Sequence, residues 1–249
     1  MVVGELPIGS VVRHGRYTLG HMPEDMIDID WIKVSKDNEF ISQRVLLGMQ
    51  FDAKEGWNAN PNYLLSNVRQ YMNSEQHHWY HPTHPDDVGP DRIMLDTYIT
   101  INIGRYPGLL AHFSDNEICL MEKINGDYMR LPTISDIIGG GLPYFKRHGK
   151  RAKPVDRFGH LVLPGYRDGM YHQYYMTDDS LRNVAEMGRD GNIKSIYAYR
   201  YSGVRPICKI KCDTEVIETG ENTYKINLLS EGPMKFFKET QSVDWLLGI

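Results

Sequence analysis

Alternation of apolar and polar side chains marks the first fifty residues as strands joined by turns. Residues 27–34 alternate in part, with aspartates between apolar positions. A period of two predicts a strand with one buried face. Residues 10–13 predict a short strand before it, and residues 40–49 predict a more apolar strand after a turn at 36–38. The chain therefore opens with a strand-rich segment.

Three short segments carry helical signals instead. Apolar residues over 65–72 fall at helical spacing behind Ser66, a good N-cap, and we expect this helix to end before residue 77. Ser114 and Glu117 have the spacing of a capping box, which predicts a helix through about residue 123. Residues 131–138 indicate a third helix, which the three glycines that follow would end.

The last third of the chain predicts hairpins. Asp190 and Gly191 lie between two apolar runs, at 181–187 and 193–199, and Asp-Gly between strands is a strong hairpin signal. We therefore expect two antiparallel strands joined at Asp190-Gly191.

Other segments are less regular. A strand is expected over 204–211, at a sheet edge or a bulge because Pro206 lacks an amide donor. Residues 219–222 predict a turn before a strand at 224–229, and residues 76–108, rich in proline, histidine and aspartate, read as a long loop.

Composition fits a folded domain with a real core. The 249 residues are 41% hydrophobic and 24% charged, and 16 tyrosines, 4 tryptophans and 7 phenylalanines favour half-buried strand surfaces. A net charge of −4 argues against a general nucleic-acid binder. The chain has no run of about 20 apolar residues and no secretory pattern, so we expect no membrane insertion and folding in a reducing cytoplasm.

The three cysteines, Cys119, Cys208 and Cys212, cannot form a disulfide framework. Cys208 and Cys212 are four residues apart on one expected strand, roughly 13 Å, which is too far for a disulfide.

Short sequence blocks follow one another in a characteristic order. They are residues 6–17, 29–31, 51–55, 65–74, 111–118, 131–137 and 175–179, then Asp190-Gly191 and Gly203-Val204-Arg205-Pro206. In this order they resemble an uncharacterised domain family of bacteriophages and Gram-positive bacteria, which closes on a Gly-Val-Arg-Pro motif and is related to the C-type-lectin-like fold. The chain departs from the family at 175–179, where a Trp-Leu-Arg-Ser-like segment is usual, and beyond Cys212.

The resemblance implies an α+β fold of the C-type-lectin-like kind, a twisted antiparallel sheet with two or three short helices and long loops. We expect this domain over residues 1–212, followed by a C-terminal hairpin and an apolar docking tail over 213–249. Gly203, Arg205, Asp190 and Gly191 are expected to be structural residues. Arg205 would form a buried ion pair or donate to loop carbonyls through its five N–H groups.

Several clusters have chemical potential, each with a plainer interpretation. The densest set of potential metal ligands is His77, His78, His81, His84, Asp86 and Asp87, but its spacing fits no standard site and its prolines favour a surface loop. Asp178-Asp179 and the pair Asp28 and Asp30 suggest calcium or the paired carboxylates of a glycosidase, although a turn or cap role is commoner for Asp178. Gly139 to Gly141 lack the Lys-Ser/Thr of a phosphate loop, and the basic run 146–153 is typical of a solvated loop. We expect no catalytic residue, metal or cofactor.

Aromatic residues of the loops are the expected contact surface, because aromatic side chains supply much of the energy of interfaces. They are Trp57, Trp79, Tyr80, Tyr166, Tyr171, Tyr174 and Tyr175.

Lectin-like folds carry variable loops on a rigid sheet. We therefore expect a non-enzymatic binding or structural protein of a phage, assembled in the bacterial cytoplasm and carried on the virion for receptor binding, in the tail or as capsid decoration. Its partners would be other virion proteins, a host surface receptor or a second copy of the chain. Two alternatives remain: a cytoplasmic phage protein that inhibits a host factor by direct binding, and a metal-dependent enzyme that uses the loop of residues 77–87.

Overall fold

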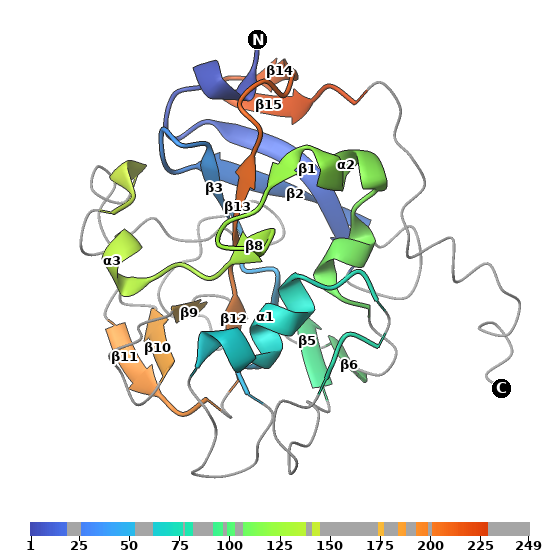
Figure 1. Ribbon diagram of the computed structural model, residues 1–249, viewed down its shortest axis with the longest axis vertical. Coiled ribbons are helices and arrows are strands. Elements are labelled where there is room, and N and C mark those ends of the chain that lie inside the picture. The colour runs from blue at the N-terminus through green and yellow to red at the C-terminus, as the bar shows by residue number, and fades with distance from the viewer. Residues whose placement is uncertain are drawn as a thin grey trace, which may run out of the picture.

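Two curled sheets, largely antiparallel, contain the strands of the described residues, with short helices beside them (Figure 1). The chain is therefore α+β, as the sequence predicts. The computed structural model describes residues 1–18, 26–52, 62–76, 78–81, 92–96, 99–102, 107–137, 141–144, 174–176, 184–187, 193–198 and 201–228.

The first sheet has the strand order β14-β15-β1-β2-β3-β13-β7, with β8 also paired to β13. All its pairs are antiparallel except β1 with β15. Its strands are β1 (Val11–Thr18), β2 (Met26–Lys33), β3 (Glu39–Ser42), β7 (Met121–Glu122), β8 (Met129–Arg130), β13 (Ile207–Ile210), β14 (Val216–Gly220) and β15 (Thr223–Ile226).

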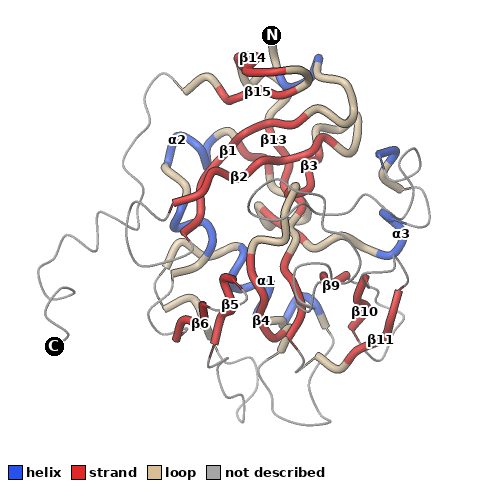
Figure 2. Tube along the Cα trace, turned by 180° about the vertical axis from the view of Figure 1, so that it is seen from behind, coloured by secondary structure: helices blue, strands red, loops and turns tan. Residues whose placement is uncertain are grey.

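The second sheet lies below the first in Figure 2 and has the order β11-β10-β9-β12-β4-β5-β6. Only β9 and β12 are parallel. Its strands are β4 (Leu47–Gln50), β5 (Arg92–Asp96), β6 (Ile99–Asn102), β9 (Tyr174–Met176), β10 (Val184–Met187), β11 (Ile193–Ile196) and β12 (Tyr201–Val204).

Helices are short in the described part of the chain, and none there is long and apolar enough to span a membrane. They are η1 (Val3–Glu5), η3 (Tyr63–Leu65), α1 (Asn67–Met72), η5 (Leu109–His112), α2 (Asp115–Cys119) and α3 (Ile134–Ile137).

The predicted caps and all three predicted helices are confirmed. The Ser66 side chain accepts a hydrogen bond from Arg69 N, and Ser114 and Glu117 form both halves of a capping box. However, α2 ends four residues before the predicted position 123, because the chain leaves the helix to pair β7 with β13.

Two chain segments run from one sheet into the other, and the sequence interpretation of both needs correction. Residues 40–49 were expected as one strand, but the structure divides them into β3 and β4. The strand expected over 204–211 is present as β13, but it begins only at Ile207, and Val204 is the last residue of β12, a strand that was not expected. Pro206 lies in the second break, between two central strands, so the expected edge position is wrong. A proline has no N–H to continue the ladder, and the chain bends there from one sheet to the other.

The interpretation of residues 76–108 as loop is also wrong in part. β5 and β6 form an antiparallel hairpin within this range, with Arg92 opposite Asn102. The prolines before β5 favoured a loop, and the run Ile93-Met94-Leu95 is too short to indicate a strand by itself. Residues 77, 82–91, 97–98 and 103–106 lie outside the described part.

The strand pairs predicted for the last third of the chain are present. β10 and β11 pair as predicted, with Met187 opposite Ile193, while residues 188–192 lie outside the described part. β14 and β15 pair around the predicted turn. A third turn, Asn125-Gly126 between β7 and β8, was missed although both residues have the positive φ angles, 52° and 96°, that Asn-Gly turns favour.

The largest core cluster lies between the sheets and the helices that flank them. It contains the fully or nearly fully buried rings of Trp31, Phe40, Tyr71, Trp79 and Phe113. A smaller cluster on the other face of the first sheet packs Ile32, Ile41 and Ile207 against α3. The β14–β15 hairpin extends the first sheet beside β1, and residues 229–249, the rest of the segment expected as hairpin and apolar tail over 213–249, lie outside the described residues.

The cysteines are free, as their number and spacing predict. Cys208 is buried in β13, whereas Cys119 and Cys212 are exposed. Burial raises the pKa of the Cys208 thiol, which is therefore protonated and unreactive at neutral pH.

Candidate functional site

Most residues of the expected aromatic contact surface lie outside the described side chains. Trp57, Tyr166 and Tyr171 lie outside the described residues, and Tyr174 and Tyr175 belong to β9, for which only the backbone is described.

Trp79 is not a surface residue. Only 2% of it is exposed, and its ring meets that of Tyr71 edge-on at 5.4 Å. The contact role predicted for it is wrong, because the ring fills the core beside α1. Tyr80 is partly buried, 6.1 Å from the Trp79 ring.

The residues of the closing motif lie where the two sheets meet. Gly203 is buried in β12 opposite Gly48. Arg205 is completely buried, and its Nε donates to the Ser42 carbonyl at 2.9 Å. Asp190 and Gly191 lie outside the described residues.

The histidine-aspartate loop is described only in part. His78 and His81 are exposed, and the other four potential ligands lie outside the described residues, as do Asp178, Asp179 and the basic run 146–153. Within the described part, no three His, Cys, Asp or Glu residues come together in a way that could hold a metal ion.

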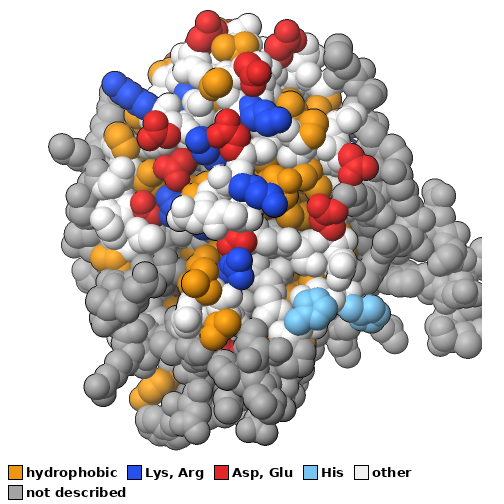
Figure 3. Space-filling model, in the orientation of Figure 1, with side chains coloured by type: hydrophobic (Ala, Val, Ile, Leu, Met, Phe, Trp, Pro, Cys, Tyr) orange, Lys and Arg blue, Asp and Glu red, His pale blue; other side chains and the backbone are white. Residues whose placement is uncertain are grey.

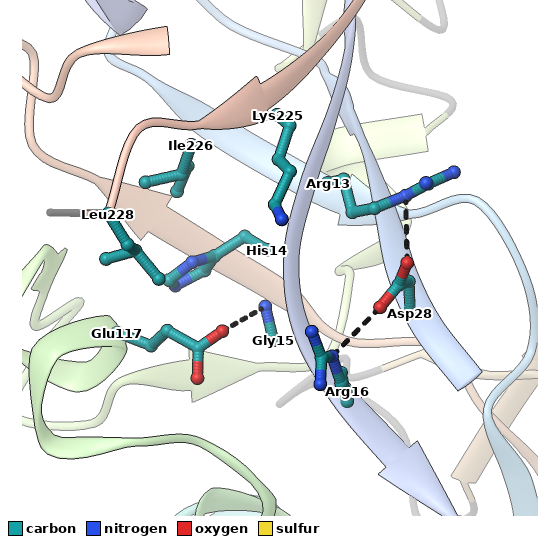
Figure 4. A pocket seen from close by; sticks show the side chains of 9 residues that line it. All are labelled: Arg13, His14, Gly15, Arg16, Asp28, Glu117, Lys225, Ile226 and Leu228. Atoms are coloured by element: carbon teal, nitrogen blue, oxygen red, sulfur yellow. Dashed lines mark hydrogen bonds and ion pairs between the residues drawn. The ribbon is translucent and has the colours of Figure 1, made fainter. Parts of the chain in front are cut away.

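The structure instead brings charged residues together around a pocket that sequence reasoning missed. The pocket lies between β1, β15, β2 and α2 (Figure 4). Its volume is about 20 Å³, which is enough for about one or two water molecules. The lining residues are Arg13, His14, Gly15, Arg16, Asp28, Glu117, Lys225, Ile226 and Leu228.

A β-bulge in β1 creates this pocket. Arg13 pairs with Asp30 and Arg16 with Asp28, so two residues of β1, His14 and Gly15, lie opposite the single residue between them on β2. Because strand side chains alternate, the extra residue lets both arginines face outward while His14 faces the core.

Side chains replace the ladder hydrogen bonds that the bulge interrupts. The Trp31 indole N–H donates to the His14 carbonyl at 2.7 Å, and the Gly15 N–H donates to Glu117 Oε1 at 3.2 Å. Glu117 Oε2 also accepts from the Ser114 N–H at 2.8 Å and from its hydroxyl at 2.9 Å. The Glu117 carboxylate therefore caps α2 and also accepts a hydrogen bond from the β1 backbone beyond Arg13, the last residue of β1 that pairs with β15.

On the outer side of the bulge, the carboxylates that suggested calcium are paired with arginines. Arg13 Nε lies 3.1 Å from Asp30 and 3.4 Å from Asp28, and Arg16 Nε lies 3.1 Å from Asp28. Such partly exposed pairs contribute little to stability but engage the carboxylates. Figure 3 shows acidic and basic side chains interspersed over the described part of one face of the protein.

His14 is the unusual member of the pocket. It is 2% exposed, and its ring meets Phe113 edge-on at 5.5 Å. Burial favours the neutral imidazole and lowers the pKa of His14 to about 3. At neutral pH the ring is therefore an uncharged polar group inside the core.

The sequence contains one signal for this site. Arg13-His14-Gly15-Arg16 interrupts an alternating strand with a glycine, which is a known mark of a bulge. The capping box was recognised, but nothing in the sequence indicated that Glu117 would reach a strand 102 residues away.

Glu117→Gln is expected to lower the free energy of unfolding by about 1–3 kcal/mol. The amide keeps one acceptor oxygen but turns an NH₂ group toward one of the donors that the carboxylate satisfies. Urea unfolding followed by circular dichroism measures the loss. Glu122→Gln is the matched control, since Glu122 forms a half-exposed ion pair with Lys209 and should cost less than about 1 kcal/mol. Equal losses in the two variants would contradict the double role of Glu117.

Comparison of the chain with protein-family models, with curated proteins and with solved structures finds no match.

Proposed function

We propose that this chain is a non-enzymatic binding or structural protein of a bacteriophage, with a C-type-lectin-like fold, and that it is carried on the virion in receptor binding, in the tail or as capsid decoration. The observation that carries the proposal is the pair of sheets joined by two continuous chain segments, with the closing motif at their junction. The phage origin rests on the order of the sequence blocks.

The junction supports the scaffold half of the proposal. β3 runs into β4 and β12 into β13, and the two segments are tied by Ser42 N–H to the Pro206 carbonyl at 3.0 Å and by Leu46 N–H to the Val204 carbonyl at 2.9 Å. The buried Arg205 adds its bond to the Ser42 carbonyl. These hydrogen bonds hold the two segments that join the sheets against each other. Such a rigid framework suits a protein whose loops bind a partner.

In the described part of the chain, the carboxylates that line the pocket beside the bulge act as structural residues. The volume of this pocket, about 20 Å³, is far below the roughly 300 Å³ or more of ordinary ligand pockets. Asp28 is engaged by two arginines, and Glu117 by three hydrogen bonds. These carboxylates therefore hold the structure together, which is the behaviour of scaffold residues.

The test is quantitative mass spectrometry of purified virions of the phage that encodes the chain. Particles are separated on a density gradient, and we expect peptides of the chain at a constant ratio to the major capsid protein in every particle fraction. A non-structural phage enzyme from the same lysate is the control and should fall away with purification. Loss of the chain in parallel with that enzyme would overturn the virion role.

A further inference from the structure

Three asparagines of the described residues have a left-handed backbone, and they differ in exposure and in the residue that follows. Asn38, Asn125 and Asn222 have φ angles of 60°, 52° and 52°. Asn38 is 8% exposed, whereas the other two are exposed. A glycine follows Asn125, whereas the β-branched Thr223 follows Asn222. Asn125 is therefore the exposed asparagine of this set whose next backbone nitrogen is not shielded by a side chain.

The turn at Asn125-Gly126 leaves the groups of a ring closure accessible. Two backbone hydrogen bonds close the turn, from the Ile124 N–H to the Asp127 carbonyl at 2.7 Å and from the Asp127 N–H to the Ile124 carbonyl at 3.2 Å. Neither the Asn125 side chain nor the Gly126 N–H has a hydrogen-bond partner among the described residues. Apart from its chain neighbours, no atom lies within 4 Å of an added Cβ on Gly126. Local opening of this exposed turn therefore brings the Gly126 nitrogen to the Asn125 side chain without displacing other residues.

We propose that Asn125 is a site of spontaneous deamidation, with water as the co-reactant. The Gly126 nitrogen loses its proton and bonds to the Asn125 Cγ atom, and the side-chain amide nitrogen leaves as ammonia, which forms a five-membered cyclic imide. Water then opens the ring at either carbonyl. The product is aspartate, or isoaspartate when the backbone runs through the former side chain. One water is consumed and one ammonia released, and no electron is transferred. This modification does not depend on the proposed virion role.

Conversion to isoaspartate affects Asp127, which directly follows the turn. Its carboxylate accepts from Arg69 Nε at 2.6 Å and from Arg69 Nη2 at 2.9 Å, and these two bonds tie the turn to α1. Isoaspartate lengthens the backbone of a two-residue turn by one methylene, which the closing hydrogen bonds of the turn do not accommodate. It also adds a negative charge two residues from Asp127. The modified turn therefore holds Asp127 less firmly against Arg69.

Incubation of the native protein in mildly alkaline buffer, well below its Tm, followed by peptide mass mapping, tests the proposal. The Asn125 peptide should gain the mass of an amide-to-acid conversion and be methylated by an isoaspartate-specific methyltransferase. Asn222 is the matched control within the same chain, because it has the same φ angle and exposure but precedes Thr223. Gly126→Ala should slow the conversion about tenfold, which corresponds to a barrier about 1.4 kcal/mol higher, and Asn125→Gln, which needs a six-membered ring, should abolish it.

The outcomes that contradict the proposal are distinct. An unchanged Asn125 peptide, after an incubation that deamidates the urea-unfolded chain, would overturn it. Equal conversion at Asn125 and Asn222 would also overturn it, since the following residue would then not matter. The isoaspartate form, separated by anion exchange through its added charge, should have a Tm about 2–4 °C below that of the unmodified chain. An unchanged Tm would contradict the weakened contact between Asp127 and Arg69.

Discussion

Gly15→Ala is expected to lower the free energy of unfolding by about 3–5 kcal/mol, because a methyl group at this position meets two obstacles. The φ angle of Gly15 is +72°, which non-glycine residues rarely adopt. A Cβ atom would also lie 2.6 Å from Phe113 Cδ1, and closer still to Cε1 and Cζ of the same ring. Phe113 is completely buried, so its ring cannot swing away without disturbing the core.

Gly126→Ala is the matched control for this substitution. Gly126 has a φ angle of +96°, but no atom lies within 4 Å of the position of an added Cβ. Its cost is backbone strain alone, about 1–2 kcal/mol. Urea unfolding of both variants separates the clash with Phe113 from the strain, and losses of the same size would show that the bulge is not packed as described.

Acid is expected to destabilise the protein through His14. The imidazole titrates near pH 6.5 in the unfolded chain, whereas its pKa in the folded chain is about 3. Between pH 6.5 and about 3, His14 is protonated in the unfolded chain but not in the folded chain. The free energy of unfolding therefore falls as the pH falls below about 6.5. The loss attributable to His14 should reach about 3 kcal/mol at about pH 4.5 and be complete near pH 3.

His14→Leu tests this assignment, since leucine is of similar size and does not titrate. Its stability, from urea unfolding at several pH values between about 7 and about 4.5, should fall by about 3 kcal/mol less than that of the native chain over this range. His78→Gln removes an exposed histidine and should retain the native decline. An unchanged acid decline in His14→Leu would mean that other groups cause it.

Local signals predicted much of the fold, and the failures share a physical cause. The Ser66 cap, the Ser114–Glu117 capping box and the β10–β11 pair depend on neighbours in the chain, so the sequence reveals them. Pro206 suggested a sheet edge because proline lacks the N–H that a central strand donates, which the sequence shows directly. That the chain passes from one sheet to the other at this point depends on distant partner strands, which the sequence does not show.

The site was less predictable because burial and long-range pairing create it. Trp79 was taken for a contact residue since aromatic residues in a proline-rich stretch resemble a loop surface, and only the packing against Tyr71 reveals a core role. The sequence did not indicate that Asp28 and Asp30 would pair with arginines. The extra residue in β1 places Arg13 opposite Asp30 and Arg16 opposite Asp28, and this register depends on the bulge. Residue types alone do not specify that register.

The parallel pairing of β1 with β15 has a consequence for how the protein is made. Val11 lies opposite Thr223, so β1, which pairs on one edge with β2, obtains its second neighbour only after more than 200 further residues have been synthesised. Contacts of such sequence separation form slowly, and the edge of β1 stays open to other chains in the meantime. On the ribosome, β1 can complete its sheet only once β15 has left the exit tunnel, which makes this pair a late and aggregation-sensitive step of folding.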